Sequence, residues 1–524
     1  MQHPWRGRTS AVLLASGLLI AAAAPAGATA LTRGLIGSVE TLDPQKAATA
    51  REAALLIDLN DGLVIRNGAG KLMPGAAASW AISSDGLTYT FTLRDGARWS
   101  NGDPVKASDF VASFRRLFDP ATGATEDGPL QVIAKAGAIK AGFAKPDALG
   151  IAAPDDKTLE IRLDKVTPTF LERLAAPAAL PVNVAAAKKL GTDFTTGAKL
   201  VSNGAYMIGA PGKRGSYALA ANPRRGGDAP AIDRVVYRSF EDASACLNAY
   251  RAGEADICPD VPTGDIAALK AEFGTALHIA PYAGTYFYVV NAGRKPFDDA
   301  RIRRALSLAV DRQALAASAW SGGMLPADDL VPPGLSPAPA APEAPIAARQ
   351  AEARTLLSEA GYGKGKPLML SIRIGSGVAH ETTAKLVIAN WNAIGVDARV
   401  VSDPESSHYG ALRDGADFDL AAAGWIADEP DALDMLQLLK SGGRFNYGRY
   451  ANSGLDGLIA AARSETDPAR RSDEIAKAEA IVRQDAPVIP LLSYAALAIV
   501  APKVTGWTDN LVDQHPSRTL AAAD

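Results

Sequence analysis

The chain has 524 residues, of which 48% are hydrophobic and 21% are charged, a composition typical of a soluble globular protein and not of a disordered or membrane-embedded one. Because this length exceeds what one ordinary hydrophobic core holds, we expect two or three lobes. The formal net charge of −3 provides no basic field, so we expect no nucleic-acid partner.

Residues 1–30 have the pattern of a secretory signal peptide that is removed after export. Arg6 and Arg8 precede an apolar stretch at residues 11–24, and residues 28–30 form a small-x-small cleavage pattern. The apolar stretch is too short to span a membrane, which needs about 20 residues. We expect cleavage after Ala30 and, because no cysteine lies at the cut, a periplasmic protein that is not a lipoprotein.

After residue 30 the chain predicts a mixed α/β protein. Period-two alternation over residues 88–100 is typical of a half-buried strand. An amphipathic helix is expected over Ser108 to Leu117, with Ser108 as its N-cap. A buried strand is predicted over residues 285–292, and the helix after it opens with two aspartates that suit its positive end.

The carboxyl-terminal half begins with a proline-rich run at residues 331–345, which we interpret as a semi-rigid surface loop. A strand at 368–374, a helix at 381–395 and a strand at 397–401 follow it. Strand–helix–strand alternation of this kind predicts a parallel sheet covered by helices.

Cys246 and Cys258 are the chain's two cysteines. They are too few for a zinc site. In an oxidising compartment a lone pair predicts a disulfide. Two free thiols remain the alternative, because the sequence does not show whether the side chains face each other.

The motifs of common enzymes are missing. His380 begins a sequence like that of a zinc metalloprotease helix, but Ala384 stands where the second histidine would be. Residues 361–366 lack the spacing of a phosphate loop, and no GxSxG elbow occurs. We therefore expect a binding protein and no enzyme, with neither a metal site nor a cofactor.

Seven separate segments, in the right order, resemble the extracytoplasmic solute-binding proteins of peptide ABC importers, the oligopeptide/dipeptide-binding type of bacterial family 5. The matching segments are residues 41–47, 85–120, 201–209, 250–257, 291–315, 356–362 and 418–436. Together they span nearly all of the chain after residue 30.

The resemblance implies a bilobed α/β periplasmic-binding-protein fold of type II, in the large cluster with an extra subdomain, with two hinge crossings near residues 282 and 494. The implied division is 31–58, 182–281 and 495–524 for lobe I, 59–181 for its satellite subdomain and 282–494 for lobe II.

The resemblance also implies a monomer whose lobes close around a peptide or peptide-like solute and then dock on a membrane permease. Strand-like hydrogen bonding to a peptide backbone does not depend on side chains. The alternative is the same fold with a non-peptide solute: an opine, a murein fragment, a metal chelate or a sugar oligomer. A ligand-sensing interaction protein and an exported hydrolase are more distant alternatives.

Asp428 matches the family aspartate that pairs with the ligand's α-amine, because a desolvated ammonium needs a carboxylate. The alternative is an aspartate that caps the helix expected from about Ala432. The match of the Gly-Trp-x-Ala-Asp context favours the ligand role. Two residues usual between this aspartate and the following Glu-Pro are absent here, so the loop after Asp428 is shortened.

Gly424, Trp425 and Ile426 are expected to offer backbone groups to an extended ligand. The Trp425 ring is expected to form a pocket wall, with a place in the core as the alternative.

Four more residues are expected near the ligand. Asn203 and Tyr206 belong to a matching segment and would flank the cleft, although an ordinary turn explains the Asn-Gly pair equally well. Tyr282 and Tyr286 lie near the strand that leads from the hinge. Because alternate strand residues face opposite ways, at most one or two tyrosines of this strand should reach the ligand.

Three departures from the family pattern bear on the ligand. Gly284 and Ile426 stand where some oligopeptide binders have a disulfide. Ala422 and Val289 stand where such binders have an arginine and a glutamate. Because the last two changes remove charges that compensate ligand termini, they favour a shorter, modified or less charged ligand.

Overall fold

The computed structural model describes residues 29–125, 127–209, 215–339 and 344–523. The predicted signal peptide therefore lies outside the described residues, apart from its last two positions. No helix in the described ranges is long and apolar enough to cross a membrane.

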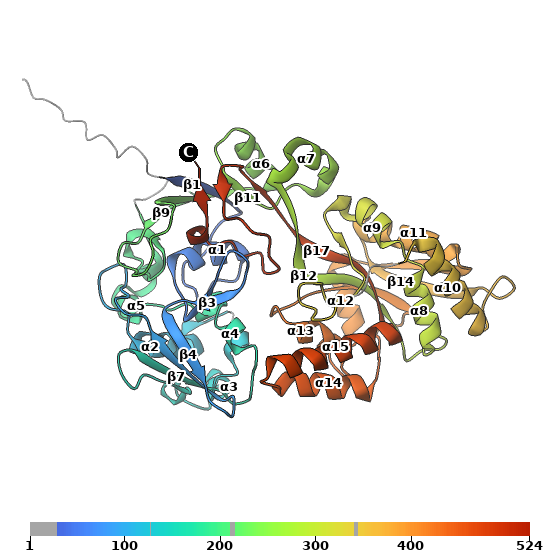
Figure 1. Ribbon diagram of the computed structural model, residues 1–524, viewed down its shortest axis with the longest axis horizontal. Helices are drawn as coiled ribbons and strands as arrows, with labels where there is room; N and C mark the ends of the chain where they lie inside the picture. Colours follow the sequence, from blue (N-terminus) through green and yellow to red (C-terminus); the bar gives the residue numbers. More distant parts are fainter. Residues whose placement is uncertain (1–28, 126, 210–214, 340–343, 524) are drawn as a thin grey trace, which may run out of the picture.

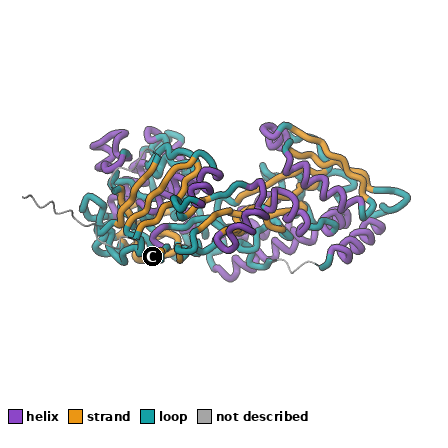
Figure 2. The backbone as a smooth tube through the Cα atoms, turned by 90° about the horizontal axis from the view of Figure 1, so that it is seen from above, coloured by secondary structure: helices purple, strands orange, loops and turns teal. Residues whose placement is uncertain are grey.

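Two lobes lie side by side and are joined by two long strands (Figure 1). These crossing strands are β12 (Leu277–Val290) and β17 (Val488–Val500), which pair antiparallel with each other. They belong to one eleven-stranded sheet of the described residues, in the order β15-β14-β16-β12-β17-β11-β1-β10-β9-β8, with β13 also paired to β17. Figure 2 shows the strands running from one lobe into the other.

Lobe I holds the strands at one end of this sheet. Its strands are β1 (Ala30–Ile36), β8 (Tyr206–Ile208), β9 (Ser216–Ala221), β10 (Arg234–Phe240), β11 (Ile257–Pro259), β18 (Val504–Thr505) and β19 (Ala521–Ala522). Its helices are α1 (Ala50–Leu59), α5 (Val184–Leu190), α6 (Ala243–Arg251) and α7 (Ile266–Phe273).

A satellite with its own sheet, in the order β4-β5-β7-β6, packs below lobe I (Figure 1). Its elements are the paired strands β2 (Val64–Arg66) and β3 (Leu72–Pro74), then β4 (Ala77–Ile82), β5 (Thr88–Leu93), β6 (Ile151–Ala152), β7 (Thr158–Arg162), α2 (Ala107–Phe118), α3 (Ala136–Lys140) and α4 (Phe170–Arg173). Large aromatic side chains, among them Phe91, Trp99 and Phe110, form its separate core.

Lobe II is a sheet covered by helices. Its strands are β13 (Leu325–Pro326), β14 (Leu368–Gly375), β15 (Val396–Asp403) and β16 (Leu420–Ile426). Its helices are α8 (Ala300–Leu308), α9 (Arg312–Ser318), α10 (Ile346–Glu359), α11 (Val378–Asn392), α12 (Glu405–Arg413), α13 (Ala432–Leu436), α14 (Ser453–Ser464) and α15 (Pro468–Asp485). The predicted parallel pairing around the helix of residues 381–395 is confirmed, since β14 pairs parallel with β15. The residue boundaries predicted for the lobes stay a prediction.

Two local predictions are corrected. The strand predicted over residues 88–100 ends at Leu93, because a turn follows it. Ser108 is not the N-cap of α2, which begins at Ala107. Asp109 provides the cap instead, since its carboxylate accepts the backbone N–H of Lys106 at 2.9 Å and the Trp99 indole N–H at 3.0 Å.

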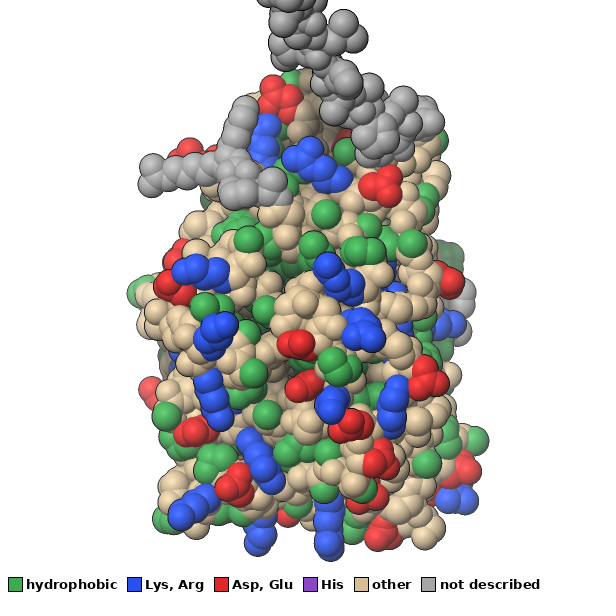
Figure 3. Space-filling view, turned by 90° about the vertical axis from the view of Figure 1, so that its left-hand side faces the viewer, with side chains coloured by type: hydrophobic (Ala, Val, Ile, Leu, Met, Phe, Trp, Pro, Cys, Tyr) green, Lys and Arg blue, Asp and Glu red, His purple; other side chains and the backbone are tan. Residues whose placement is uncertain are grey.

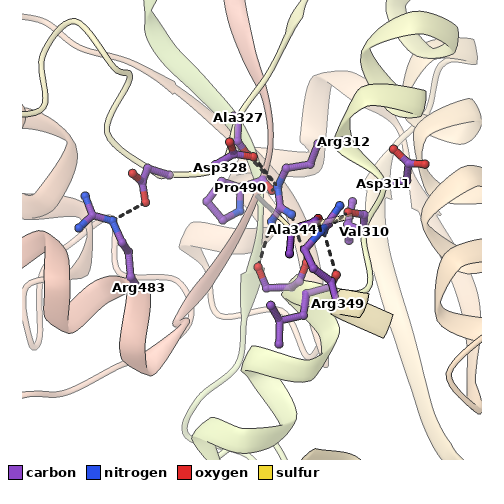
Figure 4. Close-up of polar contacts among 12 residues, drawn as sticks. Val310, Asp311, Arg312, Ala327, Asp328, Ala344, Arg349, Arg483 and Pro490 are labelled. Carbon is purple, nitrogen blue, oxygen red and sulfur yellow. Dashed lines mark hydrogen bonds and ion pairs between the residues drawn. The ribbon is translucent and has the colours of Figure 1, made fainter. Parts of the chain in front are cut away.

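Arginines connect the segment around the proline-rich run to the body of lobe II, the buried Arg312 and the half-buried Arg483 among them (Figure 4). Arg312 Nε donates to the carbonyl oxygens of Ala327 and Pro490 at 2.8 and 3.0 Å. Arg483 pairs with Asp329 at 2.8 Å and also donates to the Ala338 carbonyl. These contacts anchor the segment at both sides of the strand β17.

A disulfide joins Cys246 on α6 to Cys258 on β11, and both cysteines are fully buried. Gly34 on β1 leaves the space for it, since a Cβ there would collide with Cys246 Sγ. The bridge ties the helix to the strand that follows it.

Reduction of this disulfide is expected to lower the free energy of unfolding. The bridge joins residues 12 apart, and closing such a loop stabilises a folded chain by about 3 kcal/mol. Urea unfolding followed by circular dichroism, with and without dithiothreitol, measures the difference. The double variant Cys246→Ser, Cys258→Ser should unfold at the same urea concentration as the reduced protein, with or without dithiothreitol. Equal midpoints for the oxidised and reduced wild type would contradict the expectation.

Candidate functional site

The open edge of β16 is the central feature of the candidate site. On one side β16 pairs antiparallel with β12, with Tyr286 opposite Gly424 and Gly284 opposite Ile426. On its other side, β14 pairs only with Leu420 and Ala421. In the described part of the chain, residues 422–426 therefore have no neighbouring strand on that side.

Backbone groups of alternate residues point to this open edge. The Ala422 carbonyl oxygen lies 2.8 Å from His408 Nε2, and the Gly424 N–H donates to the Tyr409 hydroxyl at 2.9 Å. Both partners are side chains of α12 and not a strand. An incoming extended chain would replace the Tyr409 hydroxyl to form regular backbone hydrogen bonds with Gly424.

Gly424 is also a point of close approach. A Cβ at this position would collide with the hydroxyl of Tyr494, a residue of the crossing strand β17. The absence of a side chain therefore lets β17 and the edge of β16 pack together beside the hinge. Ile426, two residues on, is 46% exposed, which is unusual for isoleucine and leaves an apolar surface at the end of the strand.

The Trp425 ring packs against another aromatic ring and also lines a cavity. Its half-buried ring lies 4.9 Å from the Phe445 ring, measured between centroids. It also lines a cavity of about 160 Å³ together with Phe287, Leu438 and Tyr447. Arg413 also lines this mostly apolar cavity. Trp425 is thus a packed aromatic and a pocket wall at once.

Asp428 lies on the loop that follows β16, and its side chain is exposed. Its backbone N–H donates to Asp434 Oδ2 at 2.8 Å. The alternative role as helix cap is wrong: Asp431 caps α13, because its Oδ1 accepts the Leu433 N–H at 2.9 Å. Among the described residues, none forms an ion pair or hydrogen bond with the Asp428 carboxylate.

The Asp428 loop also touches the satellite. Glu429 forms an ion pair at 2.6 Å with Arg173, the last residue of α4. Helix α4 lies at the edge of the satellite that faces α13 (Figure 1). A polar cavity of about 600 Å³ lies between these elements and includes Lys165, Arg173 and Asp428 in its lining.

Tyr282 and Asp428 meet at one cavity of about 200 Å³, although they come from different elements. Tyr282 also lines a larger cavity of about 640 Å³ on the lobe I side, with His515 and residues 495–498 of β17. The small side chains of Ala495, Ala496 and Ala498 leave room for this second cavity.

The structure does not bring Asn203, Tyr206 or Tyr286 to these cavities. Asn203 is 4% exposed and exchanges two hydrogen bonds with the backbone of Asp61, at 3.1 and 2.9 Å. Tyr206 is fully buried in the lobe I core, where desolvation raises the pKa of its hydroxyl. The expected cleft position of these two side chains is therefore wrong, because both point inward.

Tyr286 is 1% exposed, and its hydroxyl lies 2.8 Å from His380 Nδ1. Burial lowers the pKa of His380, and Trp320 packs against both rings. Tyr286 therefore belongs to the lobe II core beside β16. His380, near the start of α11, packs against the Tyr286 ring.

Asp434 was not singled out from the sequence. It accepts hydrogen bonds from the Trp425 indole and from the Asp428 backbone, so it connects two of the predicted site residues. Burial raises its pKa to about 6, and the charges of Asp428 and Glu429 act in the same direction. No group of three or more metal-ligating side chains occurs in the part of the chain that the structure describes.

Comparisons with known proteins connect this geometry to one family. The model of the bacterial extracellular solute-binding proteins, family 5 (Middle), matches residues 71–447. The probable deoxycholate-binding periplasmic protein YgiS of Escherichia coli K12 is 34% identical, with 89% of this chain and 88% of the relative covered. The periplasmic murein peptide-binding protein MppA of the same strain is 33% identical, with 94% and 92% covered.

Solved structures show the same fold and distinguish two arrangements of it. The unliganded open form of the MppA murein tripeptide-binding protein superposes with a TM-score of 0.90 at 32% identity, covering 94% of this chain and 97% of that one. Haemophilus influenzae OppA in complex with the peptide RPPGFSPFR gives 0.64 at 30% identity, covering 95% and 99%.

The murein tripeptide-binding protein MppA of Escherichia coli gives a TM-score of 0.65 at 32% identity, with 95% of this chain and 99% of that one covered. The TM-score of 0.90 against the unliganded open form, compared with 0.64 against the peptide complex, indicates that the lobes are arranged as in the open form. Our structure therefore has the open arrangement, and the predicted bilobed fold is confirmed. The chain belongs to the bacterial extracellular solute-binding proteins of family 5.

Proposed function

We propose that this protein captures a peptide or peptide-like solute between its two lobes and delivers it to an ABC importer. The open edge of β16 at residues 422–426 is the observation that carries this proposal. A ligand in extended conformation can pair with this edge as an added strand, and its side chains then matter less than its backbone.

Asp428 is the proposed partner of the ligand's terminal ammonium. Its exposed carboxylate follows the open edge by two residues and has no cationic partner among the described residues. Closure of the lobes would remove water from this carboxylate, and an ammonium would then compensate its charge. A ligand paired with β16 would thus place its amino terminus at the end of the strand.

The cavity beside Trp425 is the proposed place for one ligand side chain. Its volume of about 160 Å³ and its aromatic walls suit an apolar group of moderate size. Ala422 and Val289 are both buried and apolar, so they offer no charge to a ligand terminus. This favours short or weakly charged ligands.

The partner that receives the solute is proposed to be the membrane permease of an ABC importer. The relatives are named as periplasmic binding proteins, and we propose the same compartment here, reached by the export signal of residues 1–30 and without lipid attachment. We also propose a monomer without catalytic activity. On the face of lobe I and the satellite seen in Figure 3, basic and acidic side chains are interspersed, as on a surface without a nucleic-acid partner.

Native mass spectrometry of protein purified without refolding tests the ligand class. We expect peptide masses to be released on dissociation of the complex. A bound opine, sugar oligomer, metal chelate or bile acid would instead support the alternative of a non-peptide solute. Turnover of a peptide library by the purified protein would favour the hydrolase.

Asp428→Asn is expected to weaken binding of trialanine on the order of 30-fold, because the substitution leaves a desolvated ammonium without its counter-charge. N-acetyl-trialanine should bind both proteins with similar affinity. Isothermal titration calorimetry measures all four combinations.

Asp417→Asn is the matched control, since Asp417 is an exposed lobe II carboxylate that pairs with Arg294. It should bind trialanine like the wild type. Equal trialanine affinities for Asp428→Asn and the wild type would remove Asp428 from the proposed role.

Gly424→Val is expected to reduce the affinity for trialanine and for its acetylated form alike, by about tenfold or more. The new side chain would displace the Tyr494 hydroxyl and crowd the open edge of β16. Gly457→Ala is the control, because a Cβ at this helical position on α14 meets no atom within 4 Å. Titration calorimetry gives the affinities, and an unchanged affinity in Gly424→Val would show that ligands do not use this edge.

A further inference from the structure

Asp434 on α13 joins three separate elements below the candidate site. Its Oδ2 accepts the Trp425 indole N–H at 3.2 Å and the Asp428 backbone N–H at 2.8 Å. Its Oδ1 accepts the Gln437 side-chain amide at 2.6 Å. The half-buried carboxylate thus holds both the pocket-wall ring and the loop that presents Asp428.

The carboxylates of this region fall into two groups. Glu429 pairs with Arg173 at 2.6 Å, and Asp431 pairs with Arg471 at 2.8 Å. Within the described ranges, no such ion pair is made by Asp428 or Asp434. Two negative charges therefore remain at the place where the proposed ammonium would enter.

Charged groups reach Asp434 from each element packed against it. Arg463 of α14 acts through Gln437, whose oxygen accepts its N–H at 3.3 Å. The Asp428 loop brings Asp428 and Glu429, and their charges oppose the ionisation of Asp434. Arg173 of α4 and Arg471 of α15 are already engaged with Glu429 and Asp431. Lys165 lines the same cavity, but the neighbouring charges that shift the pKa of Asp434 are those of Asp428 and Glu429, both negative.

We propose that Asp434 is the positioning residue of the ammonium site: it holds Trp425 and the Asp428 backbone as one hydrogen-bonded unit, and its charge joins that of Asp428 in attracting a cationic ligand. The inference rests on the proposed function, since it specifies which groups recognise the ligand's amine. It adds a residue that does not need to touch the ligand.

A dependence of binding on pH follows from this arrangement. Burial holds the pKa of Asp434 near 6 in the open state, so the carboxyl is partly protonated in mild acid. A bound ammonium favours the ionised form and lowers this pKa. Binding therefore releases a proton between the two pKa values, and affinity falls as the pH drops through 6.

The first test uses the protein without ligand. The indole N–H resonance of Trp425, assigned by its loss in Trp425→Phe, is followed by nuclear magnetic resonance between pH 5 and 7.5. We expect a shift with a midpoint near 6 that is absent in Asp434→Asn. The indole resonance is required because Trp320 packs against His380, so whole-protein fluorescence would also report the titration of that histidine.

The second test measures trialanine and N-acetyl-trialanine binding by calorimetry. For the wild type we expect trialanine affinity to fall about fivefold from pH 7.5 to pH 5, as for a carboxyl whose pKa drops by about one unit on binding. At pH 6, measurements in two buffers of different ionisation enthalpy should show proton release. The acetylated peptide and the Asp434→Asn variant should show neither effect.

Glu479→Gln is the matched control, since Glu479 is another lobe II carboxyl whose pKa burial raises, away from the cleft and beside Arg483. It should retain the wild-type pH profile. A Trp425 resonance that titrates equally in Asp434→Asn, or trialanine binding without proton release at pH 6, would overturn the proposal. If the wild type bound trialanine at no pH, the proposed function would fail, while the ligand-free titration would still decide whether Asp434 holds Trp425.

Discussion

The pairing of β12 with β17 is the interaction on which the rest of the molecule depends. Both strands run through the two lobes, so that one continuous sheet extends from lobe I into lobe II. Their register shifts between Pro281 and Thr285, near the place where the lobes part. A strand pair with an interrupted ladder can bend there without loss of the pairing on either side, which is what a hinge between two rigid bodies requires.

The candidate site lies where it does because β16 is anchored to β12. Pairing along one edge fixes the direction of β16, while the early end of its pairing with β14 leaves the other edge open. The chain then leaves the sheet after Ile426, and its loop meets the satellite through Glu429 and Arg173. The same few residues thus adjoin the hinge, offer backbone groups and contact the opposite side of the cleft.

The sequence predicted the family, the bilobed fold and the parallel β14–β15 pair, because local periodicity and ordered segments carry that information. It placed Asn203 and Tyr206 wrongly, since an Asn-Gly pair does not show which way the flanking side chains point. It could not reveal Asp434, whose role depends on hydrogen bonds from a strand end and a loop. The Arg173–Glu429 ion pair joins residues far apart in the chain, and no local pattern signals such a contact.

We propose that a ligand's backbone pairs with the open edge of β16 and that its terminal ammonium pairs with the Asp428 carboxylate. A crystal structure of the protein with a bound peptide tests this most directly. We expect closed lobes, ligand backbone hydrogen bonds to Gly424 and Ile426, and an amino terminus within hydrogen-bond distance of the Asp428 carboxylate. A peptide bound elsewhere in the cleft, with Gly424 still bonded to Tyr409 and Asp428 facing water, would contradict it.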